Sequence, residues 1–258
     1  IMKVSFAKGQ TTGISVSTAK DVENPVEDAA PQAATMPLAA QQSQAIALPP
    51  SDNGMEGEIN MKDIRPPRLN MTQSVGDLGD EFGRGVFVFD KAFALTDDKH
   101  EAIRFTVLRF KKFYQEVLAF GGDEFPAKFD TAAEVEAAGG SLVYGDDGYF
   151  SDAADILVAL EAPEHLDEGA QMYFPFEHGG KNYAMAIYTI NKSAFTAVGK
   201  KIITDSRMLL KAGLWTAGYE LSAEKRKSPK GIYFVPKIKS TGMHSPEAIA
   251  FFREMAGK

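Results

Sequence analysis

Apolar and polar side chains alternate along a stretch in the middle of the chain, residues 101–114. Ile103, Phe105 and Val107 alternate there with Arg104 and other residues, a pattern typical of a strand with one buried face. Shorter runs predict further strands at residues 85–90, 141–144, 156–161, 171–176, 182–190, 214–221 and 231–238. Two of the intervening segments, 177–181 and 224–230, are predicted to be hairpin turns.

Helical spacing appears later in the chain. Residues 192–211 place apolar side chains on one side, with Asn191 as the predicted N-cap and Gly213 as the stop. Two shorter helices are predicted at residues 131–138 and 247–255, which begin after the capping residues Thr131 and Ser245.

Many short strands, one long helix set between hairpins and a C-terminal helix favour the α+β class, because no strand–helix–strand alternation is present. A curved antiparallel sheet or an OB-like barrel is the expected architecture, formed by a single domain over residues 59–258. Residues 1–58 precede it. The stretch 28–52 consists largely of Ala, Gln, Pro and Ser without an aromatic residue, which predicts a disordered arm.

Charge is distributed unevenly along the chain. Residues 1–170 contain 14 Lys and Arg against 29 Asp and Glu, whereas residues 171–258 contain 14 against 6. Such asymmetry suggests a face that binds polyanions, although solvated lysines could also cluster without a partner. No apolar run reaches the roughly 18–20 residues that cross a membrane, and no signal peptide is recognised. We therefore expect a soluble cytoplasmic protein without membrane partners.

Enzyme motifs are missing from the sequence. The phosphate-binding, dinucleotide-binding, serine-hydrolase and zinc-protease patterns do not occur, and the chain has no cysteine. The four histidines have no partner at metal-ligand spacing, so we expect no metal and no cofactor. Acidic pairs such as Asp97-Asp98 lie in turns, where Asp bonds locally. A metal-dependent nuclease using these carboxylates is the remaining enzymatic alternative.

The central strand interleaves basic and aromatic side chains. Cations that follow phosphates and aromatic faces that stack on bases hold single-stranded nucleic acid. Strict alternation would place Phe105 and Phe113 on the same side as Arg109 and Lys111, so part of that side would be exposed. The alternative is that the phenylalanines are core residues. The candidate residues of this strand are Arg104, Arg109, Lys111, Lys112, Phe113 and Tyr114.

A second basic and aromatic set lies in the C-terminal part of the chain. It combines a stripe on the long helix, the predicted hairpin turn and aromatics of the flanking strands. OB-type barrels use loops of this kind to hold single strands. The alternative is a solvated turn and an amphipathic helix whose lysines need no partner. The candidate residues are Lys200, Arg207, Lys211, Trp215, Lys225, Arg226, Lys227, Lys230 and Tyr233.

Two segments carry a resemblance to known proteins. Residues 67–73 (PRLNMTQ) and the pair Phe174-Pro175-Phe176 and Tyr183-Ala184-Met185-Ala186, followed by a helix, resemble a loosely defined group of phage-encoded proteins over roughly residues 60–240. The resemblance implies a phage origin and either a DNA-binding accessory role in replication or recombination, or a place in the virion. Phage single-strand binders of the OB type end in an acidic tail, whereas this chain ends in FFREMAGK.

These observations lead to one hypothesis and one alternative. The hypothesis is a non-enzymatic single-stranded-DNA-binding protein of phage replication or recombination, whose residues 1–58 contact replication or assembly proteins. The alternative is a structural protein of a virion or similar assembly, in which residues 1–58 contact neighbouring subunits. Either protein could form homo-oligomers.

Overall fold

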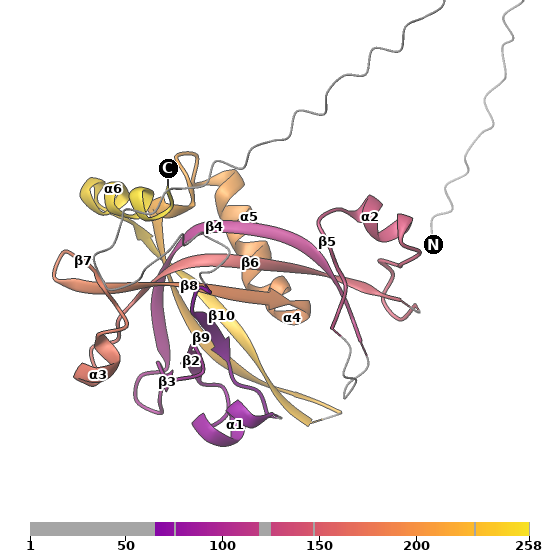
Figure 1. Ribbon diagram of the computed structural model, residues 1–258, viewed down its shortest axis with the longest axis horizontal. Helices are drawn as coiled ribbons and strands as arrows, with labels where there is room; N and C mark the ends of the chain where they lie inside the picture. Colours follow the sequence, from indigo (N-terminus) through magenta and orange to yellow (C-terminus); the bar gives the residue numbers. More distant parts are fainter. Residues whose placement is uncertain (1–64, 75, 119–124, 147, 230, 258) are drawn as a thin grey trace, which may run out of the picture. The chain divides into compact units, whose positions relative to one another are not determined.

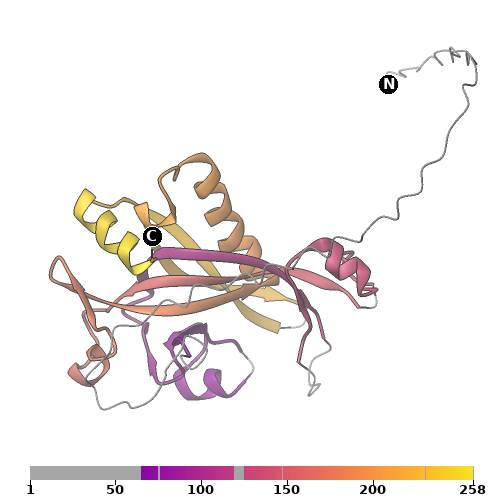
Figure 2. The same ribbon diagram turned by 45° about the horizontal axis from the view of Figure 1, so that its top comes forward.

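Five long strands of one strongly curled sheet form the centre of the molecule (Figures 1 and 2). They are β4 (Ala102–Glu116), β6 (Phe150–Glu161), β8 (Lys181–Asn191), β9 (Ala217–Ser228) and β10 (Gly231–Met243). The structure is a computed structural model that describes residues 65–257, apart from residues 75, 119–124, 147 and 230. The predicted arm, residues 1–58, lies outside the described residues.

The long strands follow one another in the order β10-β9-β4-β6-β8, and each is antiparallel to the next. Beyond β8 the sheet continues with β1 (Arg68–Met71), β2 (Phe87–Phe89) and β3 (Phe93–Ala94). β1 pairs with β8 in parallel, so the sheet is mixed. Two short strands lie beside this series, β5 (Lys128–Phe129) against β4 and β7 (Phe176–His178) against β8.

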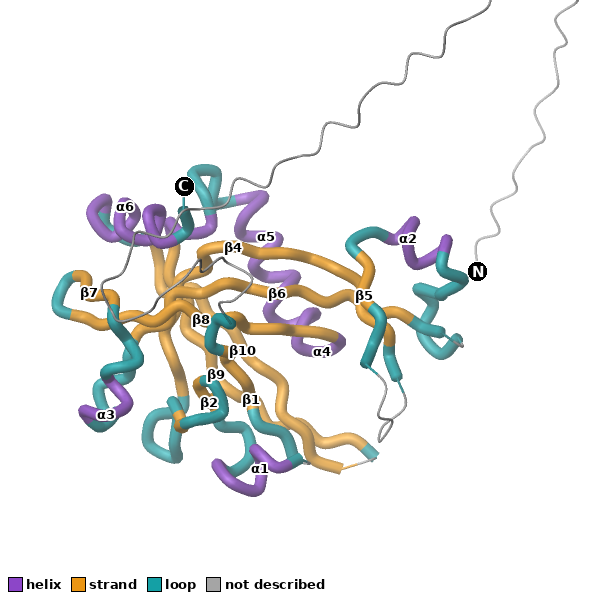
Figure 3. The backbone as a smooth tube through the Cα atoms, in the orientation of Figure 1, coloured by secondary structure: helices purple, strands orange, loops and turns teal. Residues whose placement is uncertain are grey.

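One helical rod connects β8 to β9 and comprises α4 (Lys192–Ala194), the π-helical turn η1 (Phe195–Gly199) and α5 (Lys200–Met208). The C-terminal helix α6 (Pro246–Met255) packs on a separate apolar cluster, and Figure 3 shows the rod crossing behind β4 and β6. The remaining helical segments are short: α1 (Asp77–Phe82), α2 (Ala132–Ala137), α3 (Glu168–Gln171) and the 3₁₀ turn η2 (Leu214–Thr216).

The inner side of the curled sheet holds the main core. Alternate residues of the long strands point inward, and Phe195, Val198 and Ile202 of the helical rod pack against them. Each large apolar side chain removed from water in this way contributes about 1.5–3 kcal/mol. A smaller cluster lies on the outer side, where Phe252 of α6 packs on Leu108 and its neighbours. The two clusters fix the rod and α6 on opposite sides of β4.

Side chains connect the free edge of β10 to the segment that follows β1. The amide of Gln73 donates to the carbonyl of Phe234 at 3.1 Å, and its Oε1 accepts from the Phe234 backbone N–H at 3.1 Å. The Ser74 hydroxyl donates to the carbonyl of Ile232 at 2.7 Å. Side chains therefore link β10 to the segment after β1, at a place where the described residues form no strand ladder.

Most predicted elements are confirmed. The strands predicted at 85–90, 101–114, 156–161, 182–190 and 231–238 and all three helices are present with shifted ends. Thr131 and Ser245 cap their helices, and each side-chain oxygen accepts a backbone N–H three residues on. The α+β class is also confirmed. No helix among the described residues is long and apolar enough to cross a membrane.

Three predictions are wrong. Residues 141–144 form no strand, because the Ser141 hydroxyl bonds to Asp146 and closes a turn. Residues 171–175 include the end of the short helix α3 and a turn, since Asp167 caps that helix. The hairpin turn predicted at 224–230 is mostly strand: β9 runs on to Ser228, and β10 begins at Gly231.

Candidate nucleic-acid interface

A β-bulge divides the basic and aromatic residues of β4 between two sides of the sheet. Val107 faces Val158 across the ladder and Arg109 faces Leu157, so Leu108 is an extra residue. Phe105 and Val107 belong to the inner core, whereas Leu108 belongs to the outer cluster. The prediction that Phe105 shares a side with Arg109 and Lys111 is therefore wrong, because a bulge reverses the alternation beyond it. Phe113 follows the bulge and does share their side, as predicted.

On the outer side, these residues are already engaged within the protein. The Arg109 guanidinium donates to the carbonyl of Ala256 at 2.7 and 3.1 Å and so holds the end of α6. Lys111 forms an ion pair with Asp130 at 3.0 Å. Phe113 is only 3% exposed and lies beneath the ammonium group of Lys128. Phe113 is thus a core residue, and its predicted role in base stacking is not supported by this burial.

Lys112 and Tyr114 lie together on the side that faces the helical rod. The Lys112 ammonium pairs with Asp152 at 2.7 Å and donates to the Tyr114 hydroxyl at 3.2 Å. Partial burial opposes the charge, but the bonds to Asp152 and Tyr114 outweigh it and raise the pKa of Lys112. Lys112 also lines a shallow cavity together with Arg207 of α5. This cavity joins one residue from each predicted set.

Arg104 lies apart from both groups. It faces Glu220 across the ladder to β9 and lines a cavity that also contains Glu161 and Glu164. A nucleic acid phosphate would meet several carboxylates here, so Arg104 is not part of a cationic surface.

Trp215 is the second aromatic whose predicted role changes. It lies half-buried in η2 and packs against the outer cluster beneath α6. Lys200 and Arg207 are exposed on α5, as expected for a helix stripe. The helix ends at Met208, because the backbone N–H groups of both Leu209 and Leu210 bond to the carbonyl of Asp205. Lys211 therefore follows the helix and does not extend the stripe.

The β9–β10 hairpin presents its basic residues on paired strands. Lys225, Arg226 and Lys227 are exposed on β9, and Arg226 also forms an ion pair with Glu224 at 3.2 Å. Tyr233 of β10 faces Arg226 across the ladder and is exposed. Lys230 lies outside the described residues. The hairpin thus presents its cations and Tyr233 from paired β-strands, where the sequence had predicted a turn.

The connection between β4 and β6 contains aromatic residues that the sequence interpretation missed. This segment, residues 117–149, is called the arm loop below. Tyr144 is 88% exposed and its ring meets the Tyr149 ring edge-on, with centroids 5.6 Å apart. Phe125 is 97% exposed. The sequence signal was the pair of tyrosines flanking a Gly- and Asp-rich turn, but Tyr144 was predicted to end a strand and was not considered as a stacking residue.

A cavity of about 430 Å³ separates the arm loop from the helical rod. Tyr144 and Tyr149 line it from one side, and Lys192 and Lys200 line it from the other. An aromatic pair beside two cations can stack on a base and neutralise the phosphate next to it. Asp152, which also lines the cavity, is paired with Lys112, and this pairing limits its repulsion of a phosphate.

Comparison with known protein families, with curated proteins and with solved structures found no match to this chain.

Proposed function

We propose that the chain binds single-stranded DNA without catalysing a reaction, and that its curled sheet is an OB-type barrel. The strand order supports the barrel assignment. β4, β6 and β8 form a meander, the helical rod follows, β9 returns beside β4, and β10 lies outside β9. This arrangement with the helix between the third and fourth strands is expected of a five-stranded OB barrel, in which two loops hold the oligonucleotide.

The positions of the exposed basic and aromatic residues support the same function. In an OB barrel the binding loops join the first to the second strand and the fourth to the fifth. Here the first connection is the arm loop, and the second is the tip of the β9–β10 hairpin. Both protrude on the same side of the barrel in Figures 1 and 2.

The observation that carries the proposal is the cavity between the arm loop and the helical rod. Its tyrosines would stack on bases, and Lys192 and Lys200 would neutralise phosphates. The hairpin cations Lys225, Arg226 and Lys227 would follow the strand further along its backbone. A phage accessory role in replication or recombination fits this chemistry. The virion alternative rests on residues 1–58, which lie outside the described residues.

The first test is a fluorescence-anisotropy titration of labelled oligo-dT with the purified protein at about 50 and 200 mM salt. We expect micromolar or tighter binding that weakens steeply with salt, because phosphate neutralisation releases counterions. Absence of binding at the lower salt concentration would contradict the proposal.

The variant Tyr144→Ala tests the cavity itself. Loss of one stacked base costs about 1–3 kcal/mol, so the dissociation constant should rise roughly 5- to 150-fold. Tyr173→Ala is the matched control, since Tyr173 is exposed near α3, away from the arm loop. If the two variants bind equally well, the stacking role of Tyr144 is wrong.

A further inference from the structure

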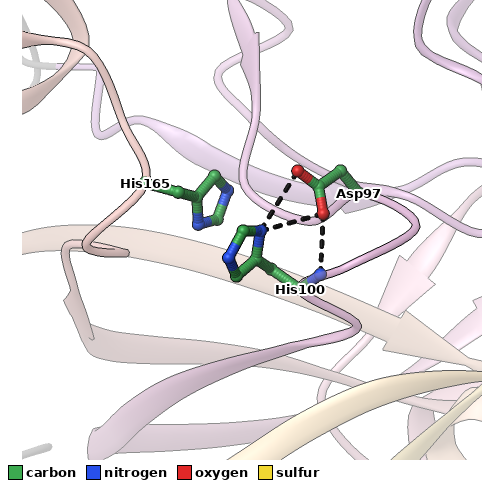
Figure 4. A group of neighbouring side chains, drawn as sticks. All are labelled: Asp97, His100 and His165. Atoms are coloured by element: carbon green, nitrogen blue, oxygen red, sulfur yellow. Dashed lines mark hydrogen bonds and ion pairs between the residues drawn. The ribbon is translucent and has the colours of Figure 1, made fainter.

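Two histidines that are distant in the sequence lie against each other at the side of the barrel. His100 precedes β4, and His165 lies in the loop between β6 and α3. Their rings are nearly parallel, at 5°, with centroids 4.0 Å apart. Asp97 completes the group (Figure 4), and one ligand atom from each of the three residues lies within 4.8 Å of the others. The sequence analysis expected every histidine to lack a metal-ligand partner. For His100 and His165 this expectation is wrong.

The carboxylate of Asp97 is fixed in a tight turn. Its Oδ1 accepts the backbone N–H groups of Lys99 at 2.8 Å and of His100 at 2.6 Å. Nδ1 of His100 lies 3.0 and 3.1 Å from the two carboxylate oxygens. The contact with the His100 side chain, together with these backbone bonds, lowers the pKa of Asp97 to about 2. The turn thus holds the carboxylate in a fixed orientation beside the His100 ring.

The stacked imidazoles present ring nitrogens beside the carboxylate of Asp97. The adjoining cavity is lined by Glu161, Glu164 and Glu220, with Arg104 as the cation among its lining residues. The carboxylates outnumber the cation, so the surroundings favour a divalent positive ion.

We propose that Asp97, His100 and His165 bind a divalent transition-metal ion such as Zn²⁺. Two imidazole nitrogens and one carboxylate oxygen suit Zn²⁺ and its late first-row neighbours, whereas Mg²⁺ and Ca²⁺ prefer oxygen ligands. Tetrahedral Zn²⁺ with bonds near 2.0–2.1 Å separates its ligand atoms by about 3.3 Å. Nδ1 of His100 and Oδ2 of Asp97, the carboxylate oxygen that does not accept the two backbone N–H groups of the turn, are already 3.1 Å apart. On binding, the ion would release to solvent any proton carried by Nδ1.

All three side chains are exposed, so His165 can move toward the other two without disturbing the core. Three protein ligands leave a fourth position for water. The ion would tie the turn before β4 to the loop after β6. This site is independent of the proposed DNA-binding surface, because none of its residues lines the arm-loop cavity.

Isothermal titration of the full chain with Zn²⁺ tests the proposal, and Co²⁺ absorption reports the ligand geometry. We expect one ion per chain and visible bands typical of four-coordinate Co²⁺. Removing a second-shell partner typically costs 10–100-fold in metal affinity, so loss of a ligand in His100→Ala or His165→Ala should cost at least about 10-fold.

Asp97→Asn separates charge from turn geometry, since its amide oxygen can still accept the two backbone N–H groups. It should therefore weaken Zn²⁺ binding while the fold is retained. His178→Ala is the control, because His178 stacks on Phe251 away from the cluster. Zn²⁺ should raise the melting temperature of the wild type and of His178→Ala but not of His165→Ala. No saturable binding, or equal weakening by His178→Ala and His165→Ala, would overturn the proposal.

Discussion

His244 combines a partly buried hydrogen bond with an imidazole whose pKa is lowered in the folded protein. Its Nε2 lies 2.8 Å from the Thr106 hydroxyl, and its ring packs on Phe252 of α6. Burial lowers the pKa of His244 below its ordinary value, and the nearby charge of Glu161 opposes this effect only in part. The neutral imidazole is therefore the form that the folded protein favours.

A pH dependence of stability follows from this difference. The unfolded chain binds the proton with a pKa near 6.5, and the folded protein binds it less readily. The contribution to stability is therefore complete above about pH 6.5 and is lost as the pH falls toward the lower, folded-state pKa. Urea unfolding at pH 7 and pH 5 should show a smaller loss for His244→Gln than for the wild type. His178→Gln is the control and should lose as much unfolding free energy between pH 7 and pH 5 as the wild type. If His244→Gln also loses as much as the wild type, the assignment to His244 is wrong.

Residue type alone did not decide which aromatics are exposed. Phe113 follows Lys112 and Trp215 lies four residues after Lys211, yet Phe113 lies beneath Lys128 and Trp215 beneath α6. Tyr144, which is the most accessible tyrosine of the described residues, was absent from the predicted site. Burial depends on which distant segment covers a side chain, and neither β5 nor α6 could be placed on the sheet from local pattern.

At the scale of elements, β10 pairs with β9 along one edge, and its other edge is bonded by the side chains of Gln73 and Ser74. Gln73 supplies both a donor and an acceptor to the backbone of Phe234. Gln73→Ala removes both bonds, each of which contributes about 0.5–1.5 kcal/mol. We expect the free energy of unfolding to fall by about 1–3 kcal/mol, with faster hydrogen exchange at the Phe234 amide.

Asn70→Ala provides the control for this edge, because the Asn70 amide contacts only the nearby Arg68 carbonyl, at 3.5 Å. Hydrogen exchange measured by mass spectrometry or NMR would distinguish the two variants. Unchanged protection at Phe234 in Gln73→Ala would show that the strand does not need this closure.

Periodicity predicted most strands and helices but not their irregularities. The alternation around Phe105 correctly predicted β4, yet Leu108 carries no Gly or Pro signal that marks a bulge. The parallel pairing of β1 with β8 joins segments far apart in the chain, and no local pattern encodes it. The same holds for the His100–His165 contact. Such features depend on tertiary packing, which overrides local preference.

At the scale of the whole molecule, the excess positive charge of residues 171–258 makes a quantitative prediction. The affinity for single strands should fall with salt by a logarithmic slope of about −0.7 for each phosphate neutralised. Replacing Lys225, Arg226, Lys227 and Lys230 with Ala should make the slope shallower by up to about 3. Titrations at several salt concentrations measure it.

Lys91→Ala with Lys99→Ala is the control for this charge change, because both lysines are exposed on the connections around β3. Their removal should leave the slope nearly unchanged. A hairpin variant with the slope of the wild type would show that the hairpin does not contact phosphates, even if the cavity beside the arm loop does.

The arm loop leaves and rejoins the curled sheet at neighbouring points, since Glu116 and Phe150 are partners across the β4–β6 ladder. It is therefore an insertion into a hairpin, and loops of other lengths could be grafted there while the ladder is kept. Such an exchange would uncover Phe113 and Phe150, on which Lys128 and Phe129 now pack. During evolution, the loop can thus change in length and sequence only where Phe113 and Phe150 are replaced as well.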